Sequence, residues 1–211
     1  MSAAKCRIAV LASGRGSNFK ALAERCQDSG FSCFVACLVT DNGSAPAVST
    51  AHAFGIPVHV IDAGERRGRL QPGAEAEIVR VCRAADVHLI VLAGFMRILE
   101  GELLDNFTGR VMNIHPSLLP SFKGLNAQRQ AFEYGVRLAG CTVHFVDASL
   151  DGGPIILQAA VPVRDDDDAE SLRGRILDEE HRILVRAVDL FARGRLRIDG
   201  RRVYGADDSP S

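Results

Sequence analysis

The alternation of short apolar runs with helix-forming stretches is the feature that most constrains the fold of this chain. The apolar runs span 7–12, 34–40, 57–61, 87–93 and 110–114, and helical patterns stand between most of them. Uninterrupted apolar runs are typical of strands buried on both faces of a sheet. Strands separated by helices pair in parallel through right-handed crossovers. The sequence therefore predicts an α/β fold with a mostly parallel, Rossmann-like twisted sheet and helices on both faces.

The pattern changes in the C-terminal part of the chain. The apolar runs 140–146 and 155–163 are separated only by residues 147–154, a connection too short for a helical crossover. We expect these two runs to form an antiparallel strand pair. An amphipathic helix over 169–193 and a short strand over 196–198 follow.

Size and composition limit the class of protein. The 211 residues contain no linker or internal repeat, so we expect one domain over 1–211 that ends in a disordered tail over 205–211. The formal net charge of −1 argues against a nucleic-acid surface, which needs a basic excess. No apolar run approaches the roughly 18 residues that span a bilayer. The six cysteines form no CxxC pair and indicate reduced core residues of a cytoplasmic protein, with metal binding a remoter alternative.

A glycine loop from Ser13 to Asn18 follows the first apolar run and precedes a helical pattern. This is the layout in which backbone N–H groups and a helix N-terminus bind a phosphate. Ser17 or Asn18 can also cap the helix. The loop is not the dinucleotide fingerprint, because Phe19 occupies the third glycine position. A plain strand-to-helix turn is the alternative interpretation.

The fifth apolar run ends in Asn113 and His115, which are two residues apart. Their side chains should point to the same side of an extended chain. Pro116 and Pro120 disfavour helix in the loop that follows. The sequence thus predicts a hydrogen-bond donor beside a proton-transfer group, at the strand end where parallel sheets bind ligands. A strand end whose polar residues merely face water is the alternative.

Three further features carry candidate functional groups. Asp151 stands at a glycine-containing turn between the two antiparallel strands. Glu180 falls within the apolar stripe of the long helix, where it suits either a core hydrogen bond or a bound ligand. The segment from Gly94 to Leu99 suits either a flat heteroaromatic ligand or core packing.

A carboxylate orients a nearby imidazole and favours its protonated form, and a neutral amide suits an oxyanion. These residue types support acyl transfer to a nucleophile that the substrate brings.

The stretches SGRGSN, AGFMRIL, MNIHPSLLPSFKG, GCTVHFV and LDGGPIILQAAVPV stand in this order through most of the chain. In sequence and spacing the chain resembles the phosphoribosylglycinamide formyltransferase family, the folate-dependent glycinamide ribonucleotide transformylases of purine biosynthesis. The resemblance implies an enzyme that transfers the formyl group of 10-formyltetrahydrofolate, its co-substrate, to the amine of glycinamide ribonucleotide. The transfer would proceed by direct attack through a tetrahedral intermediate. We also expect no metal, no nucleic-acid or membrane partner, and either a monomer or a homodimer.

The resemblance also implies roles for single residues. His115 would be the proton donor, and Asn113 and Asp151 would complete the catalytic trio. The residues that would bind the ribonucleotide are Gly16, Ser17, Asn18 and Glu180. The residues that would bind the folate are Arg69, Met96, Arg97, Ile98, Leu99, Asn113 and Asp147. Residues 1–125 would form a nucleotide-binding half and residues 126–198 a half that closes over the folate.

One segment departs from the family pattern. The family has a folate-contacting arginine after the third strand, among aromatic and acidic landmarks, whereas this chain has ERRGRLQPGAEAE there. Among Arg66, Arg67 and Arg69, we choose Arg69 for the contact with the glutamate tail of the folate.

Two alternatives interpret the same residues differently. Another formyl-folate enzyme, either a hydrolase or a transferase with a different acceptor, would share the catalytic trio but would be expected to carry an additional domain. A non-catalytic folate- or nucleotide-binding module would not require the trio.

Overall fold

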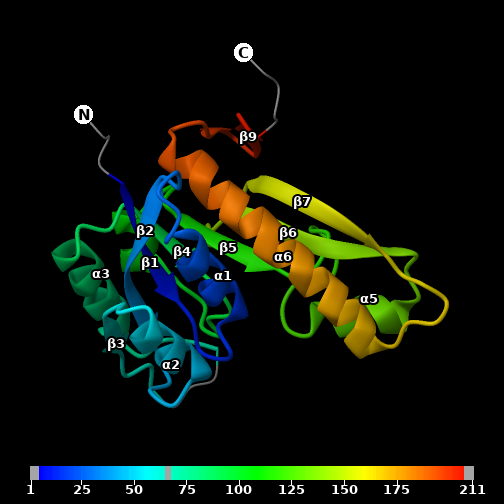
Figure 1. Ribbon diagram of the computed structural model, residues 1–211, viewed down its shortest axis with the longest axis horizontal. Helices are drawn as coiled ribbons and strands as arrows, with labels where there is room; N and C mark the ends of the chain where they lie inside the picture. Colours follow the sequence, from blue (N-terminus) through cyan, green and yellow to red (C-terminus); the bar gives the residue numbers. More distant parts are fainter. Residues whose placement is uncertain (1–4, 65–67, 207–211) are drawn as a thin grey trace. The chain divides into compact units, whose positions relative to one another are not determined.

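The computed structural model describes residues 5–64 and 68–206, and the chain divides into two compact units (Figure 1). The first unit is Met1–Met112 and the second is Asn113–Ser211. The prediction of a single domain over 1–211, with a change of role near residue 125, stays a prediction.

The first unit contains the alternating strands and helices that the sequence predicts. Strand β1 lies between β2 and β4, β3 pairs with β2, and all of these pairings are parallel. The elements are β1 (Cys6–Leu11), α1 (Ser17–Arg25), β2 (Cys33–Thr40), α2 (Pro46–Ala53), β3 (Val58–Val60), α3 (Ala74–Ala84), β4 (Leu89–Leu92) and α4 (Gly101–Asn106). β5 (Val111–His115) begins in this unit and ends in the second.

The burial of β1 in the core of the first unit explains why its sequence is an uninterrupted apolar run. Ile8 to Leu11 are fully buried, as expected for a strand with paired neighbours on both sides and helices over the sheet. Phe19 and Leu22 of α1 are also fully buried, and α1 contacts β2. The short α4 lacks a long apolar period and was not predicted.

The second unit has the antiparallel pair that the sequence predicts. β6 (Leu138–Phe145) pairs antiparallel with β7 (Ile155–Pro162), and α6 (Ala169–Ala192) packs on both strands (Figure 1). The unit also contains α5 (Ala127–Tyr134) and a terminal hairpin of β8 (Arg197–Asp199) and β9 (Arg202–Tyr204). The sheet of the chain is therefore mixed, with its antiparallel pairs near the C-terminus, and the predicted fold class is confirmed.

Side-chain hydrogen bonds define the N-terminus of α6. Asp168 caps the helix by accepting from Glu170 N at 3.0 Å and Ser171 N at 2.7 Å, and Ser171 Oγ accepts from Asp168 N at 3.0 Å. This reciprocal capping box satisfies N–H groups that have no partner within a helix.

Of the predicted tail, Ala206 is buried and its carbonyl accepts from Arg186 Nη2 at 2.9 Å, whereas residues 207–211 lie outside the described residues. Within the described ranges, no helix is long and apolar enough to cross a membrane.

Candidate active site

Asn113 and His115 project from the end of β5 into a cluster of polar side chains in the second unit. Asn113 Nδ2 lies 3.2 Å from His144 Nε2, and His115 Nδ1 lies 3.4 Å from Asp151 Oδ2. Asp151 Oδ1 lies 3.9 Å from His144 Nε2. The structure thus brings together the three residues predicted from the sequence and adds His144 as a fourth.

The position of Asp151 depends on the backbone of the turn between β6 and β7. Asp151 itself has a left-handed φ of 45°, and Gly153 packs so closely that a Cβ there would lie 1.9 Å from the Phe145 carbonyl oxygen. Only glycine tolerates that approach. Gly124 N donates to Asp151 Oδ2 at 2.8 Å, and the side chain is only 11% exposed. The carboxylate is therefore fixed in place before any ligand binds.

The two ring nitrogens of His115 have different partners. Its Nε2 lies 2.9 Å from the Phe122 carbonyl oxygen, which can only accept, so Nε2 carries a hydrogen. Its Nδ1 faces the Asp151 carboxylate, and the ring is buried. The Phe122 carbonyl and the Asp151 carboxylate thus fix the orientation of the imidazole, as a proton-transfer group requires.

His144 has the opposite surroundings. Its Nδ1 donates to the Phe145 carbonyl at 2.8 Å, which leaves Nε2 as an acceptor for the Asn113 amide. Burial lowers the pKa of His144, and the nearby His115 lowers it further, although the Phe145 carbonyl and Asp151 oppose this shift. His144 is therefore neutral and fixes which end of the Asn113 amide faces it. An amide nitrogen carries two hydrogens, so the second can point at a ligand.

The loop between β5 and α5 is held by a buried threonine on β6. Thr142 Oγ1 donates to the Ser117 carbonyl at 2.6 Å and accepts from Leu119 N at 3.1 Å and Gln158 Nε2 at 3.0 Å. Thr142 and His144 are two residues apart on one strand. Sequence reasoning missed His144, yet two polar residues at this spacing in an apolar run were a usable signal.

Glu180 and Asp147 also lie in the second unit. Glu180 lies on α6 and is 5% exposed. Burial raises the pKa of Cys141 on β6 to about 12, and the negative charge of Glu180 is the second cause of this rise. The Glu180 carboxylate therefore lies near β6. Asp147 Oδ1 accepts from Ser149 N at 2.8 Å at the exposed start of the turn. Their roles toward the ribonucleotide and the folate stay predictions.

The glycine loop of the first unit has the geometry of an anion cradle. Gly16 is the N-cap of α1 with φ 70°, and a Cβ there would meet the Ala47 Cβ at 2.7 Å. Ser17 is already the first helical residue, and no side chain caps the helix, so the prediction that Ser17 or Asn18 is the cap was wrong. The close contact with Ala47 selects glycine at the cap position. The N-terminal N–H groups of a helix attract anions.

The residues of the segment after β4 differ in their exposure to solvent. Met96 and Ile98 are 56% and 41% exposed, whereas Leu99 is 3% exposed and belongs to the core. Arg97 Nε donates to Asp41 Oδ2 at 2.7 Å, so its guanidinium binds the protein itself. Asp41 was not among the predicted site residues.

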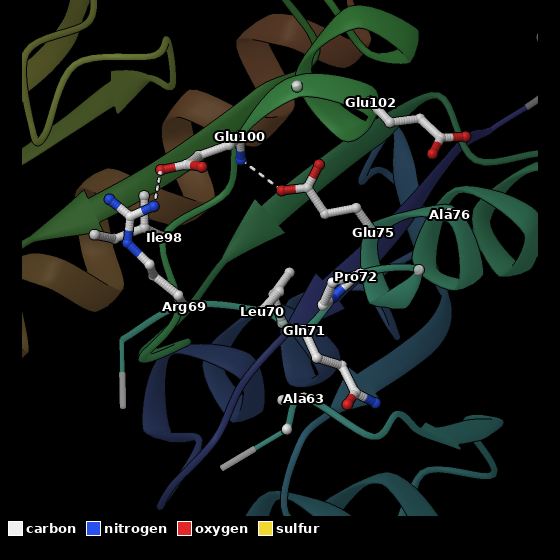
Figure 2. A pocket seen from close by; sticks show the side chains of 13 residues that line it. Ala63, Arg69, Leu70, Gln71, Pro72, Glu75, Ala76, Ile98, Glu100 and Glu102 are labelled. Carbon is white, nitrogen blue, oxygen red and sulfur yellow. Dashed lines mark hydrogen bonds and ion pairs between the residues drawn. The ribbon is translucent and has the colours of Figure 1, made fainter. Parts of the chain in front are cut away.

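Arg69 lies on the wall of a cavity of about 770 Å³ in the first unit (Figure 2). Its guanidinium pairs with Glu100 at 3.3 Å, and Glu100 N donates to Glu75 Oε1 at 2.5 Å. Arg66 and Arg67, the alternatives to Arg69, lie outside the described residues. Among the described residues, no group of three or more His, Cys, Asp or Glu side chains could hold a metal ion.

Comparison with known proteins identifies the family. Residues 6–188 match the formyl transferase family. This chain belongs to the formyl transferase family. It is 37% identical over 212 residues to the phosphoribosylglycinamide formyltransferase of Escherichia coli, which covers 95% of this chain and 99% of that protein. Glycinamide ribonucleotide transformylase 1 from Symbiobacterium toebii has a similar structure, with a TM-score of 0.91 and 46% identity over 98% of this chain and 96% of that one.

Two other family members differ in length from this chain. The chain spans about a fifth of the trifunctional purine biosynthetic protein adenosine-3 of Gallus gallus, with 41% identity over 92% of this chain and 19% of that protein. A formyltetrahydrofolate deformylase from Pseudomonas syringae has a TM-score of 0.89 at 30% identity, and the match covers 98% of this chain and 67% of the deformylase. A protein named as a deformylase and a protein named as a transformylase thus have structures similar to that of this chain.

Proposed function

We propose that this chain transfers the formyl group of 10-formyltetrahydrofolate to the amine of glycinamide ribonucleotide, in the synthesis of purines. The observation that carries the proposal is the cluster of Asn113, His115 and Asp151, with His144 holding the amide. Relatives named for this reaction match nearly the whole chain at 37–46% identity.

The cluster supports a direct transfer. The amine nitrogen of the ribonucleotide would attack the formyl carbon, and the oxygen of the tetrahedral intermediate would accept a hydrogen bond from Asn113. The bond from the formyl carbon to the folate nitrogen would then break. His115 would protonate that nitrogen, and the proton that the attacking amine loses would pass to a water molecule near Asp151 and from there back to His115. The products are the formylated ribonucleotide and tetrahydrofolate, and no bond to the enzyme forms.

The binding roles extend the proposal to single residues. Gly16, Ser17 and Asn18 would hold the phosphate of the ribonucleotide, and Glu180 its ribose or glycinamide end. Met96 to Leu99, Asp147 and Arg69 would bind the folate. The enzyme would act in the cytoplasm as a monomer or homodimer on small-molecule substrates, without nucleic acid or membrane.

One experiment separates this function from its alternatives. Purified protein is mixed with 10-formyltetrahydrofolate, with and without glycinamide ribonucleotide, and the release of tetrahydrofolate is followed. We expect release that depends on the ribonucleotide. Release that ignores the ribonucleotide would identify a hydrolase, and no release would favour a binding module.

A further inference from the structure

The buried ion pair between Asp41 and Arg97 is a feature of the first unit that the proposed chemistry does not use. The Asp41 side chain is 7% exposed and that of Arg97 is 17% exposed, and Arg97 Nε lies 2.7 Å from Asp41 Oδ2. Asp41 Oδ1 is buried and has no hydrogen-bond partner among the described residues. Arg97 therefore supplies the opposite charge beside this buried carboxylate.

Arg97 also reaches the segment that carries Arg69. Its Nη1 donates to the Arg69 carbonyl at 3.2 Å, next to a bridge between Arg69 and Ile98 in which Ile98 N donates to the Gly68 carbonyl at 2.9 Å. The Arg69 side chain then extends along the cavity wall to Glu100 (Figure 2). Asp41 thus lies at one end of a chain of contacts that ends at Arg69.

Contacts with the glycine loop strengthen this arrangement. Ser13 Oγ accepts from Met96 N at 3.1 Å, and Ser13 N donates to the Gly94 carbonyl at 3.1 Å. Burial raises the pKa of Asp41, but Ser13 and Arg97 together hold it below its ordinary value. The carboxylate is therefore charged and holds Arg97 at neutral pH.

We propose that Asp41 is a positioning residue that sets the affinity for formyl-folate by holding Arg97, and through Arg97 the backbone of residues 68–70 and 96–98, in place. The inference rests on the proposed function. Asp41 and the Arg69 carbonyl hold Nε and Nη1 of the Arg97 guanidinium. Arg97 therefore acts on the folate by shaping the backbone and presenting Arg69.

The test compares Asp41→Ala, Arg97→Ala and the double variant in the formyl-transfer assay. Each single variant is expected to raise KM for 10-formyltetrahydrofolate by about tenfold and to leave kcat within about threefold of wild type. The double variant is expected to be no worse than either single variant, because both remove one contact. Additive losses, or a lower Tm with an unchanged folate KM, would overturn the proposal.

Two further variants sharpen the comparison. Asp41→Asn keeps the shape of the side chain and one acceptor oxygen. It is expected to raise the folate KM by less than Asp41→Ala does. This variant can still be measured if the Asp41→Ala protein fails to fold. Asp28→Asn is the control, because it removes the charge of an exposed carboxylate that pairs with Arg25 on the surface. Its folate KM is expected to match wild type, and a rise equal to that of Asp41→Asn would overturn the proposal.

A readout without turnover keeps this inference separate from the proposed function. Wild-type protein that fails to transfer formyl groups would refute the function. The inference is then tested by equilibrium dialysis with tetrahydrofolate and by hydrogen exchange at Ile98 N. Asp41→Ala is expected to weaken binding by about tenfold and to speed exchange at Ile98 N. Unchanged binding and exchange would overturn the inference whatever the reaction.

Discussion

Asn113 and His144 share a hydrogen bond of 3.2 Å in which the neutral imidazole accepts from the amide nitrogen. The direction of this bond follows from the Phe145 carbonyl, which takes the hydrogen of His144 Nδ1. We therefore expect His144→Phe, which removes the acceptor, to lower kcat by up to about 10²-fold, the low end for loss of one oxyanion donor. The double variant with Asn113→Ala should be no slower than Asn113→Ala, as kcat measurements will show. A further loss in the double variant would mean that His144 acts independently of Asn113.

His144 also makes stability depend on pH. Because burial holds its pKa below the ordinary 6.5, the unfolded chain binds a proton at a pH where the native ring stays neutral. The contribution of this group to stability is present above about pH 6.5 and is lost as the pH falls through the native pKa. Thermal unfolding between pH 8 and pH 5 should show a steeper acid loss for wild type than for His144→Gln. The control His52→Gln, at an exposed position of α2, should keep the wild-type slope.

Asp151→Asn should lower kcat by about 10²–10⁴-fold, the range for general acid–base groups. The amide keeps the size of the side chain but removes the charge that faces His115 Nδ1. The KM for the ribonucleotide should change little. Steady-state kinetics with both substrates measure this, and an unchanged kcat would remove Asp151 from the mechanism.

Gly16→Ala should weaken ribonucleotide binding and destabilise the protein by about 1–2 kcal/mol or more, the cost of a side chain in the left-handed region. The added Cβ would meet Ala47 at 2.7 Å, whereas a Cβ at Gly14 in the same loop meets no atom within 4 Å. Gly14→Ala is thus the matched control. Chemical denaturation and ribonucleotide KM should separate the two variants, and equal behaviour would show that the contact with Ala47 is unimportant.

Cys6 should be the first cysteine to react with an alkylating reagent at neutral pH. A hydrogen bond from Cys33 lowers the pKa of Cys6 against the opposing effect of burial, and the thiolate is the reactive form. Burial raises the pKa of Cys37 to about 11 and that of Cys82 to about 12. Peptide mapping after brief labelling should find the label on Cys6, and Cys6→Ser should abolish the fast phase. Early label on Cys82 would contradict its complete burial on α3.

Some errors in the predicted elements have local causes. The cap of α1 was predicted at Ser17 or Asn18 because serine and asparagine are frequent caps, but the contact between Gly16 and Ala47 sets the boundary one residue earlier. The hairpin of β8 and β9 was predicted only as a short strand, because its exposed residues carry little apolar period.

The sequence by itself determined the strands β1 to β7, the long helix and the shared direction of Asn113 and His115, because these depend on periods of 2 and 3.6 residues and on proline nearby. Its motifs also identified the family. Tertiary structure decided the partners. His144 meets Asn113 across 31 residues of sequence, and Asp41 meets Arg97 across 56. Contacts between residues so far apart in sequence depend on strand register and on burial, which no local pattern encodes. From the sequence, Asp41 was therefore interpreted as a turn residue and His144 as part of an apolar strand, and only the fold showed their partners.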